Sequence, residues 1–542
     1  MTSRFELRGQ NELEVILKFG GGLNTRASEE EVDLREATDG QNVQLDPQNR
    51  ELRSRGPYDL VGTAPNGGEI RGFATLKRAD GTVSFLVQAS DTVYDWDGSA
   101  FTLKRTVSPT ARLRGRKEHN WILDDKVLIT DLELAEPVME YDGTTLSNIN
   151  FNLPGSFLAK YCFVAAERAT FGNVVSNGVA TPHVLVGSQR EDFTVLSVTD
   201  RPSSALSVQD PWFLTTPDLK PINGIVQAYT SNDATGTGQD QRIILSSENG
   251  VLSKINGQNA QDFAIAEFYP ESAATGDESL RFIGNDIVYG REGRIESVAA
   301  TDRFGDVATN DLSQVIADEI RDFTGWTTVY NSRFQRVYMF PEGQSEVWVL
   351  FKELQGGQFS PWMRWRTQHS LAFQPTAVLN MFDPQDGLEY TFMGDASGNI
   401  YRLEGSGTSG DAGAANIQTE WLSRLFQMPK QTQAFGIQGY IQYRSNVSNT
   451  VRLRIEYAGE SAFNDERTIV LPAVDTQPGA DHWSGDAYWG GNFFWGAPNA
   501  GRLIREKFGF AGQANTFQIR VISDGTNPLE INEIGLNFEA GR

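Results

Sequence analysis

Residues 93–99 read VYDWDGS, and residues 138–144, 45 positions further along, read VMEYDGT. Each segment predicts the end of one strand, a tight Asp-Gly turn and the start of the next strand. Asp and Gly suit a two-residue hairpin because both tolerate a positive φ. A hairpin that recurs at intervals of roughly 40–50 residues has the spacing of β-propeller blades, each made of four strands. The repeat therefore predicts an all-β fold built around a β-propeller.

Similar hairpin signatures continue along the chain. Asp80-Gly81, Asn249-Gly250 and Ser397-Gly398 each separate two short runs of apolar and β-branched residues. We therefore predict a β-propeller-like domain with insertions over residues 58–404, a length that suits roughly six or seven blades. Residues 310–323 depart from the pattern, because their apolar residues recur at helical spacing, and we expect an amphipathic helix on the propeller rim.

The sequence before the propeller predicts an arm rather than a domain. Residues 1–57 contain a glycine run at residues 20–22, after which the acidic segment following Ser28 predicts a short helix ending near Gly40. Residues 43–53 then read as a hairpin around an Asp-Pro turn.

The sequence after the propeller predicts a second β domain. Residues 405–413 form a Gly/Ser-rich linker. Residues 414–542 predict a β-sandwich, or platform, domain, because apolar residues alternate with polar ones along residues 451–457 and 517–521. Few helices are expected in the whole chain.

Composition narrows the class of protein. The chain has 542 residues and a formal net charge of −23. This negative charge argues against tight nucleic-acid binding. It is compatible with a role in solubility alone, or with a protein wall past which DNA slides. The single cysteine, Cys162, lies in an apolar run and is expected to be a buried structural thiol. We expect no signal peptide at the N-terminus and no membrane-spanning segment, because no apolar run is long enough.

Because the sequence lacks recognisable catalytic motifs, we predict that the chain is not an enzyme. The four histidines share no metal-binding motif, and neither a nucleophile elbow nor a P-loop lysine motif occurs. Residues 405–410, GSGTSG, match a dinucleotide-binding pattern, but no βαβ unit surrounds them. The Asp-box repeat of sialidase propellers is absent. We therefore expect no catalytic residues, no metal and no cofactor.

One Gly-rich segment gathers large aromatic side chains. Three interpretations remain open: a platform on which sugars stack, a subunit interface, or a loop folded onto its own domain. We predict that this segment contacts another subunit or the adaptor. Its six aromatic residues are Trp483, Tyr488, Trp489, Phe493, Phe494 and Trp495.

The arm carries a family resemblance. Residues 21–25 read GGLNT, residues 41–47 read QNVQLDP, and residues 52–58 read LRSRGPY. This order resembles the opening of the tail nozzle (tubular tail) proteins of short-tailed bacteriophages. Scattered later motifs are similar too, such as DIVYGREGRI at residues 286–295 and GQFSPW at residues 357–362, although the latter lacks the first Trp of the family pattern.

The resemblance implies a structural virion protein. Such a subunit would form a homohexameric ring at the distal end of the tail, after assembly in the host cytoplasm. The ring would dock on a tail adaptor protein, contact tail fibre or plug proteins, and pass double-stranded DNA during ejection without sequence-specific binding. The arm and sandwich would form the ring platform, the propeller would decorate it, and the acidic charge would be biased toward the lumen.

Two other functions remain open from the sequence. A propeller and a sandwich can both present loops to carbohydrate, which leaves a carbohydrate-binding protein as an alternative. Paired carboxylates among its 70 acidic residues also leave a propeller glycosidase open.

Overall fold

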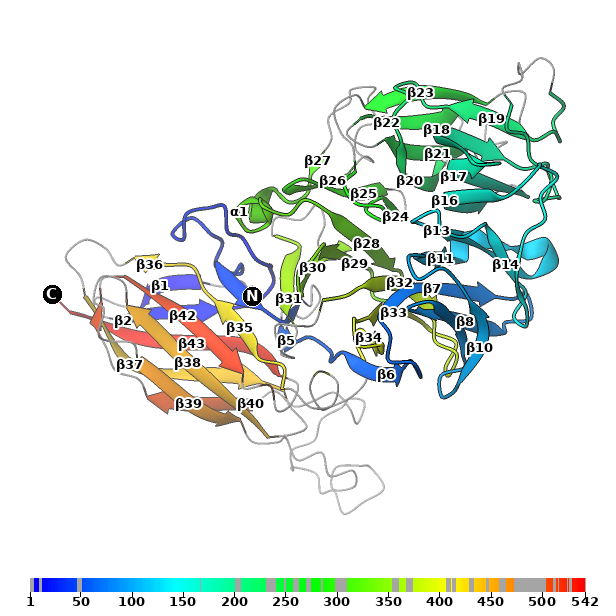
Figure 1. Cartoon of the computed structure of the whole chain (residues 1–542). Helices are drawn as coiled ribbons and strands as arrows, with labels where there is room; N and C mark the ends of the chain where they lie inside the picture. The colour runs from blue at the N-terminus through cyan, green and yellow to red at the C-terminus, as the bar shows by residue number, and fades with distance from the viewer. Residues whose placement is uncertain are drawn as a thin grey trace, which may run out of the picture. The chain divides into compact units, whose positions relative to one another are not determined.

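The computed structural model is almost entirely β-structure (Figure 1). It describes residues 4–8, 12–45, 51–165, 167–199, 206–230, 240–247, 250–256, 263–269, 274–283, 286–297, 310–352, 360–366, 374–405, 411, 416–427, 433–444, 448–457, 465–471, 504–509, 513–514, 516–523, 525 and 529–541. The chain divides into two compact units. Unit 1 comprises Met1–Asp59, Trp348–Ser370 and Glu404–Arg542, and unit 2 comprises Leu60–Val347 and Leu371–Leu403.

Unit 2 is built from successive antiparallel sheets. The first has the order β10 (Phe101–Thr106), β9 (Thr92–Trp96), β8 (Val83–Ala89), β7 (Ile70–Lys77), β11 (Leu113–Gly115), β13 (Lys126–Asp131), β14 (Met139–Tyr141) and β15 (Leu146–Asn148), with β12 (Asn120–Trp121) beside β13. It consists of two four-stranded blades, joined where β11 pairs in parallel with β7.

The later sheets each hold four strands. They are β16 (Phe157–Ala165), β17 (Arg168–Ser176), β18 (Val179–Gly187) and β19 (Trp212–Thr215); β20 (Ile222–Thr230), β21 (Asp240–Ser247), β22 (Leu252–Asn256) and β23 (Ala264–Tyr269); β24 (Arg281–Ile283), β25 (Asp286–Arg291), β26 (Arg294–Ser297) and β27 (Asn310–Asp311); β28 (Trp326–Asn331), β29 (Arg336–Pro341), β30 (Glu346–Phe351) and β31 (Trp362–Arg366); and β32 (Ala377–Phe382), β33 (Glu389–Gly394), β34 (Asn399–Arg402) and β6 (Asp59–Thr63). The division between the two units falls inside β30.

These sheets close into a ring, which confirms the predicted β-propeller. Successive blades contact each other in order. The contacting strands are β7 with β11, β13 with β16, β16 with β20, β20 with β24, β24 with β28, and β28 with β32. β32 then contacts β7, and the early strand β6 completes the last blade beside β34 (Figure 1). The rings of Phe85 and Phe392, from the first and last blades, lie 5.2 Å apart. Pairing an early strand with the last blade leaves no open seam.

The repeated segments of the sequence form equivalent hairpins in adjacent blades. One joins β9 to β10 and the other joins β14 to β15. The prediction of a two-residue turn is wrong, because Trp96 pairs with Phe101 and the loop holds four residues. Gly98 has a φ of +92°, whereas the preceding Asp97 stays out of the left-handed region and accepts from the backbone N–H groups of Ser99 and Ala100 at 2.8 and 2.7 Å. The aspartate therefore acts through its carboxylate.

The expected helix over residues 310–323 is mostly absent. Asn310 and Asp311 pair with β26, and helical structure is confined to a 3₁₀ turn at Gln314–Ile316 and to α1 (Ala317–Ile320). Two positions of the apolar pattern, Ile316 and Ile320, are fully buried, and its other apolar side chains are partly buried. Strand pairing with β26 removes the residues that the helix would need for its first turn.

Two further sheets lie in the described part of unit 1. One has the order β1 (Arg4–Arg8), β2 (Glu12–Leu17), β43 (Glu530–Gly541), β37 (Gln433–Tyr443) and β40 (Ile504–Gly509), with β4 (Val43–Leu45), β5 (Leu52–Ser54) and β41 (Gln513–Ala514) attached. The other has the order β3 (Asp39–Gln41), β35 (Thr419–Leu422), β42 (Thr516–Ser523), β38 (Asn449–Tyr457) and β39 (Asp465–Leu471), with β36 (Phe426–Gln427) beside β42.

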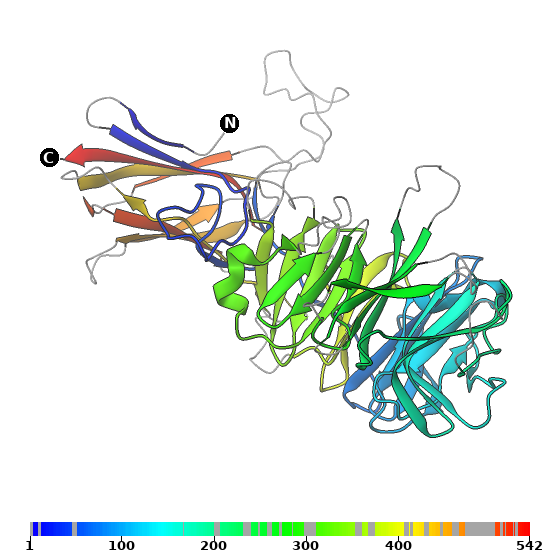
Figure 2. The same ribbon diagram turned by 90° about the horizontal axis from the view of Figure 1, so that it is seen from above.

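The two sheets form two layers, as expected for a sandwich (Figure 2). Both sheets carry buried apolar side chains. The predicted alternation holds, since Leu453 and Ile519 are buried while Arg454 and Arg520 are only half-buried. The rings of Phe517 and Phe538 lie 4.7 Å apart and link the two sheets. Burying a side chain of this size contributes about 1.5–3 kcal/mol.

The N-terminal arm belongs to both sheets of unit 1. β2 and β5 pair with β43, and β3 pairs with β35. The predicted hairpin is confirmed by the pairing of β4 with β5. The predicted helix between Ser28 and Gly40 is wrong: the segment forms turns, and Gly40 lies in β3, where an added Cβ would stand 2.8 Å from the carbonyl oxygen of Glu420. This close approach, rather than a helix end, explains the glycine.

Candidate functional site

Arg55 is the centre of a buried polar junction in unit 1. Its Nη1 and Nη2 donate to the two carboxylate oxygens of Asp411 at 2.8 and 2.6 Å. Its Nε donates to Oδ1 of Asn42 at 2.9 Å, and its remaining donors reach the carbonyl oxygens of Gly56 and Arg366. All five N–H donors of the guanidinium are therefore satisfied.

Local backbone conformation prepares this junction. Asn42 lies between β3 and β4 with a φ of +59°, a conformation that asparagine adopts more readily than most residues. Its backbone N–H donates to the carbonyl of Arg364 at 2.9 Å, and its carbonyl accepts from the N–H of Arg55 at 3.0 Å. The side-chain oxygen of Asn42 is thereby directed at the guanidinium.

The environment of the junction stabilises the charged form of Arg55. Burial by itself lowers the pKa of Arg55, but Tyr58 and Asp411 outweigh it, so that the pKa of Arg55 lies above its usual value. Burial raises the pKa of Tyr58, whose ring lies under the guanidinium with Cζ 4.0 Å from the ring centroid. Both partners of the Arg55–Asp411 pair are almost completely buried. Removing one of them would leave a buried charge without its counterion.

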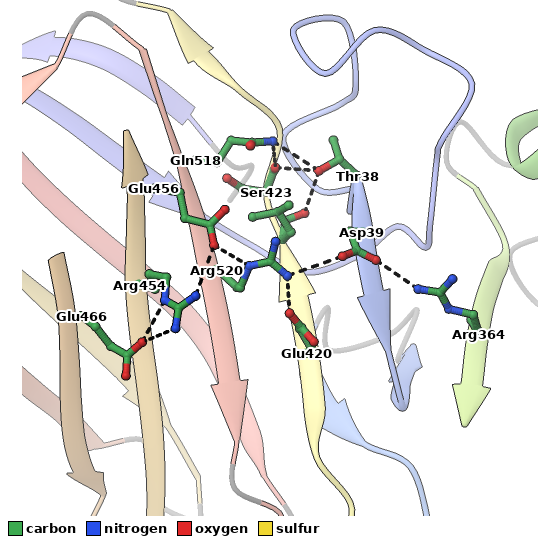
Figure 3. Close-up of polar contacts among 11 residues, drawn as sticks. Thr38, Asp39, Arg364, Glu420, Ser423, Arg454, Glu456, Glu466, Gln518 and Arg520 are labelled. Atoms are coloured by element: carbon green, nitrogen blue, oxygen red, sulfur yellow. Dashed lines mark hydrogen bonds and ion pairs between the residues drawn. The ribbon is translucent and has the colours of Figure 1, made fainter. Parts of the chain in front are cut away.

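A second polar feature, here called the arginine ladder, crosses the outer face of the sheet that contains β3 (Figure 3). Arg520 on β42 donates from Nε to Glu456 at 2.6 Å, and its Nη1 contacts Glu420 and lies 3.4 Å from Asp39. Arg364 reaches the other oxygen of Asp39 at 3.1 Å. The ladder consists of Asp39, Arg364, Glu420, Arg454, Glu456, Glu466 and Arg520.

The ladder alternates its charges so that two arginines can face each other. Arg454 and Arg520 are register partners on β38 and β42, a placement that is unfavourable without compensation. Glu456 contacts Arg520 and lies 4.0 Å from Arg454, while Oε2 of Glu466 accepts from both Nε and Nη2 of Arg454, at 2.8 and 2.6 Å. Hydrogen bonds to Glu456 and Glu420 overcome partial burial and raise the pKa of Arg520. The ladder thus couples the arm strand β3 to the sandwich.

The aromatic segment selected from the sequence lies outside the described residues. This applies to all of Trp483, Tyr488, Trp489, Phe493, Phe494 and Trp495. Their role as a subunit or adaptor contact stays a prediction.

Cys162 and His119, two other candidate reactive residues, are both buried. Cys162 is buried, as predicted, and burial raises the pKa of its thiol, which disfavours the reactive thiolate. Buried His119 hydrogen-bonds through Nδ1 to the carbonyl of Leu128 at 3.2 Å. Within the described ranges, no group of three or more His, Cys, Asp or Glu side chains is placed to hold a metal ion. In the same ranges, no helix is long and apolar enough to cross a membrane.

The fold defines an all-β protein that combines a β-propeller with a two-sheet unit. No protein-family model matches the chain, and no curated protein matches it. Among solved structures, BBS1N in complex with ARL6DN gives a TM-score of 0.40 at 10% identity, covering 65% of this chain and 98% of that one. The WD40 domain of Toxoplasma gondii coronin gives 0.38 at 10% identity, covering 67% and 88%. The β-propeller domain of Cps50 (Swd1) from Myceliophteria thermophila gives 0.31 at 12%, covering 65% and 100%. The propeller assignment rests on the closed succession of sheets.

The sequence indicated only part of the Arg55 junction and of the arginine ladder. Arg55 lies in the LRSRGPY motif, so its segment was singled out, but its partner Asp411 falls in the predicted linker and carries no local signal. The alternation along β38 and β42 identified the polar face, whereas the contacts of Arg520 with Asp39 and Glu420 join residues 481 and 100 positions apart.

Proposed function

We propose that this chain is a structural subunit of the tail nozzle of a short-tailed bacteriophage. It assembles into a homohexameric ring that docks on the tail adaptor, contacts fibre or plug proteins, and conducts double-stranded DNA. The propeller fold alone suits many roles, so the proposal depends on the segments that flank the propeller.

One observation supports the proposal most directly. The arm segments that carry the resemblance, residues 21–25, 41–47 and 52–58, belong to the same unit as the sandwich. β3 and β5 pair with strands of the two sandwich sheets, and Arg55 fastens the end of the arm to Asp411. An arm anchored in this way contributes to a rigid platform, which is what a ring-forming subunit requires.

The contact segments of the ring follow from the sequence. The aromatic residues between Trp483 and Trp495 provide the side chains that are enriched in interface cores. The net charge of −23 suits a conduit whose wall repels DNA, and we place the excess acidic charge toward the lumen. A ring structure with a strongly basic lumen would contradict that placement.

The test is assembly of the purified full-length chain, alone and mixed with the tail adaptor of the same phage. Light-scattering mass across a concentration series and negative-stain imaging should show a closed ring with an open centre. Persistence of a monomer under both conditions would overturn the proposal, and binding to a glycan array would then favour a carbohydrate-binding function.

Substitutions separate the interface from the platform. Trp489→Ala and Phe494→Ala should reduce ring formation while leaving thermal unfolding of the monomer unchanged. Leu103→Ala, an exposed apolar residue on β10 of the propeller, is the control and should assemble normally. Normal ring formation by both aromatic variants would remove this segment from the interface.

A further inference from the structure

Three arginines of unit 2 converge on the carboxylate of Glu278. Arg114 on β11 donates from Nε to Oε2 at 2.9 Å, and Arg116 donates from Nη2 to Oε1. Arg281 on β24 places its Nη2 3.8 Å from Oε1. The carbonyl of Glu278 accepts from the N–H of Thr328 at 3.0 Å, which fixes the loop before β24. We call Arg114, Arg116, Glu278 and Arg281 the arginine cluster.

The guanidinium groups present more donors than Glu278 accepts. Within the described part of the chain, Nη2 of Arg114, Nε of Arg116 and Nη2 of Arg281 are buried and have no hydrogen-bond partner. Nε and Nη2 share one edge of a guanidinium, so the unpaired nitrogen of each arginine lies on the edge that contacts Glu278. Buried donors are rarely left without a hydrogen-bond partner, and Glu278 does not supply one to these three nitrogens.

Positive charge is also in excess around the cluster. Burial lowers the pKa of Arg114, and burial together with Arg116 lowers the pKa of Arg281 to about 9. Asp277 is already engaged, since it accepts from the hydroxyl of Tyr161 at 2.9 Å and pairs with Lys160 at 4.0 Å. The charged groups in or beside the cluster are Arg112, Arg114, Arg116, Lys160 and Arg281 against Glu118, Asp277 and Glu278.

The cluster has a buried floor and a partly exposed rim. The side chains of Arg114 and Glu278 are 3% and 4% exposed, whereas those of Arg116 and Arg281 are 17% and 15% exposed. Arg116 and Arg281 therefore stand between solvent and the floor, and the floor provides an environment in which charge-assisted hydrogen bonds are strong.

We propose that the arginine cluster binds a small oxyanion such as phosphate or sulfate. The oxygens of the anion supply the acceptors that the three nitrogens lack, and its charge offsets the excess of arginine. Planar guanidinium edges match such an anion in geometry. This site lies in the propeller unit and does not depend on the proposed ring.

Titration of the full-length chain with inorganic phosphate or sulfate tests the site. At constant pH and ionic strength, replacing chloride by either anion should raise the thermal unfolding midpoint in a saturable manner, and calorimetry should give one site per chain. Arg281→Gln and Arg116→Gln should each weaken binding about tenfold or more, because each removes charge-assisted contacts.

The matched control is Arg321→Gln, since Arg321 pairs with Asp318 in the same unit and its side chain is 71% exposed. This variant should bind as the wild type does. If Arg281→Gln fails to fold, Arg281→Lys keeps the charge, loses the guanidinium edge, and should also bind more weakly. Equal binding by both cluster variants and the wild type, or a stabilisation that never saturates, would overturn the proposal.

Discussion

The guanidinium of Arg55 and the carboxylate of Asp411 form a bidentate pair, with N–O distances of 2.8 and 2.6 Å, between residues 356 positions apart. Asp411 also accepts from the backbone N–H of Tyr58 at 3.0 Å. One carboxylate thereby holds two points of the chain segment that follows β5. The pair joins the end of the arm to the chain segment that follows the propeller.

We expect Asp411→Asn to destabilise unit 1 by about 3–5 kcal/mol, because it leaves the Arg55 guanidinium buried without its counterion. Urea unfolding should show the loss as a lower midpoint. The control is Asp465→Asn, which removes an ion pair with Arg467, whose side chain is 45% exposed, and should cost about 0–1 kcal/mol. Similar costs for the two variants would show that Arg55 finds another acceptor.

In the arginine ladder, Glu456→Gln should destabilise the chain by about 1 kcal/mol, since Arg454 and Arg520 would face each other without the carboxylate between them. Thermal unfolding at low ionic strength measures the effect. The difference from the wild type should shrink in 1 M NaCl, where partly exposed charges are screened. A loss that is independent of salt would point to packing instead of charge.

His119 gives the propeller unit a defined acid sensitivity. Burial, with the nearby charge of Arg116, lowers the pKa of His119 to about 3. Between pH 6.5 and 3 the unfolded chain therefore binds a proton that the folded chain excludes. The stability contributed by neutral His119 is complete above pH 6.5 and is lost as the pH falls, by at most about 1.4 kcal/mol per pH unit.

We expect His119→Asn to reduce this sensitivity, because an asparagine amide can still donate to the carbonyl of Leu128 but does not titrate. Urea unfolding of both proteins at pH 7 and pH 5 provides the comparison, and the variant should lose less stability than the wild type. Equal losses would assign the acid sensitivity to other groups.

Gly40→Ala should destabilise the chain by about 1–3 kcal/mol, since the new methyl group would stand 2.8 Å from the backbone carbonyl of Glu420 and force β3 away from β35. Gly509→Ala is the control, because no atom of the described residues lies within 4 Å of the added carbon there. Differential scanning calorimetry should separate the two variants. Wild-type stability of Gly40→Ala would mean that the arm strand shifts without cost.

Several parts of the fold were predictable because they depend on neighbours in the chain. The repeated segments around Gly98 and Gly143 predicted adjacent blades, and the alternation of Leu453 and Ile519 with polar residues predicted the sandwich face. The apolar run around Cys162 predicted its burial. The prediction of a helix after Ser28 was wrong, because the segment forms turns and leads into β3, whose Asp39 pairs with Leu422, 383 positions further along the chain. The resemblance to tail nozzle proteins and the aromatic contact stay predictions.

The sequence by itself determined the strand periodicity, the turn positions and the class of fold, because alternation and turn chemistry act over a few residues. Only the tertiary structure decided which distant charges meet. Arg55 pairs with Asp411, and Arg114 pairs with Glu278, because the tertiary fold of each unit brings these distant positions of the chain together. The sequence around an isolated Asp or Glu in a loop does not indicate which arginine will pair with it. The energy of such a pair arises only after burial has removed both groups from water.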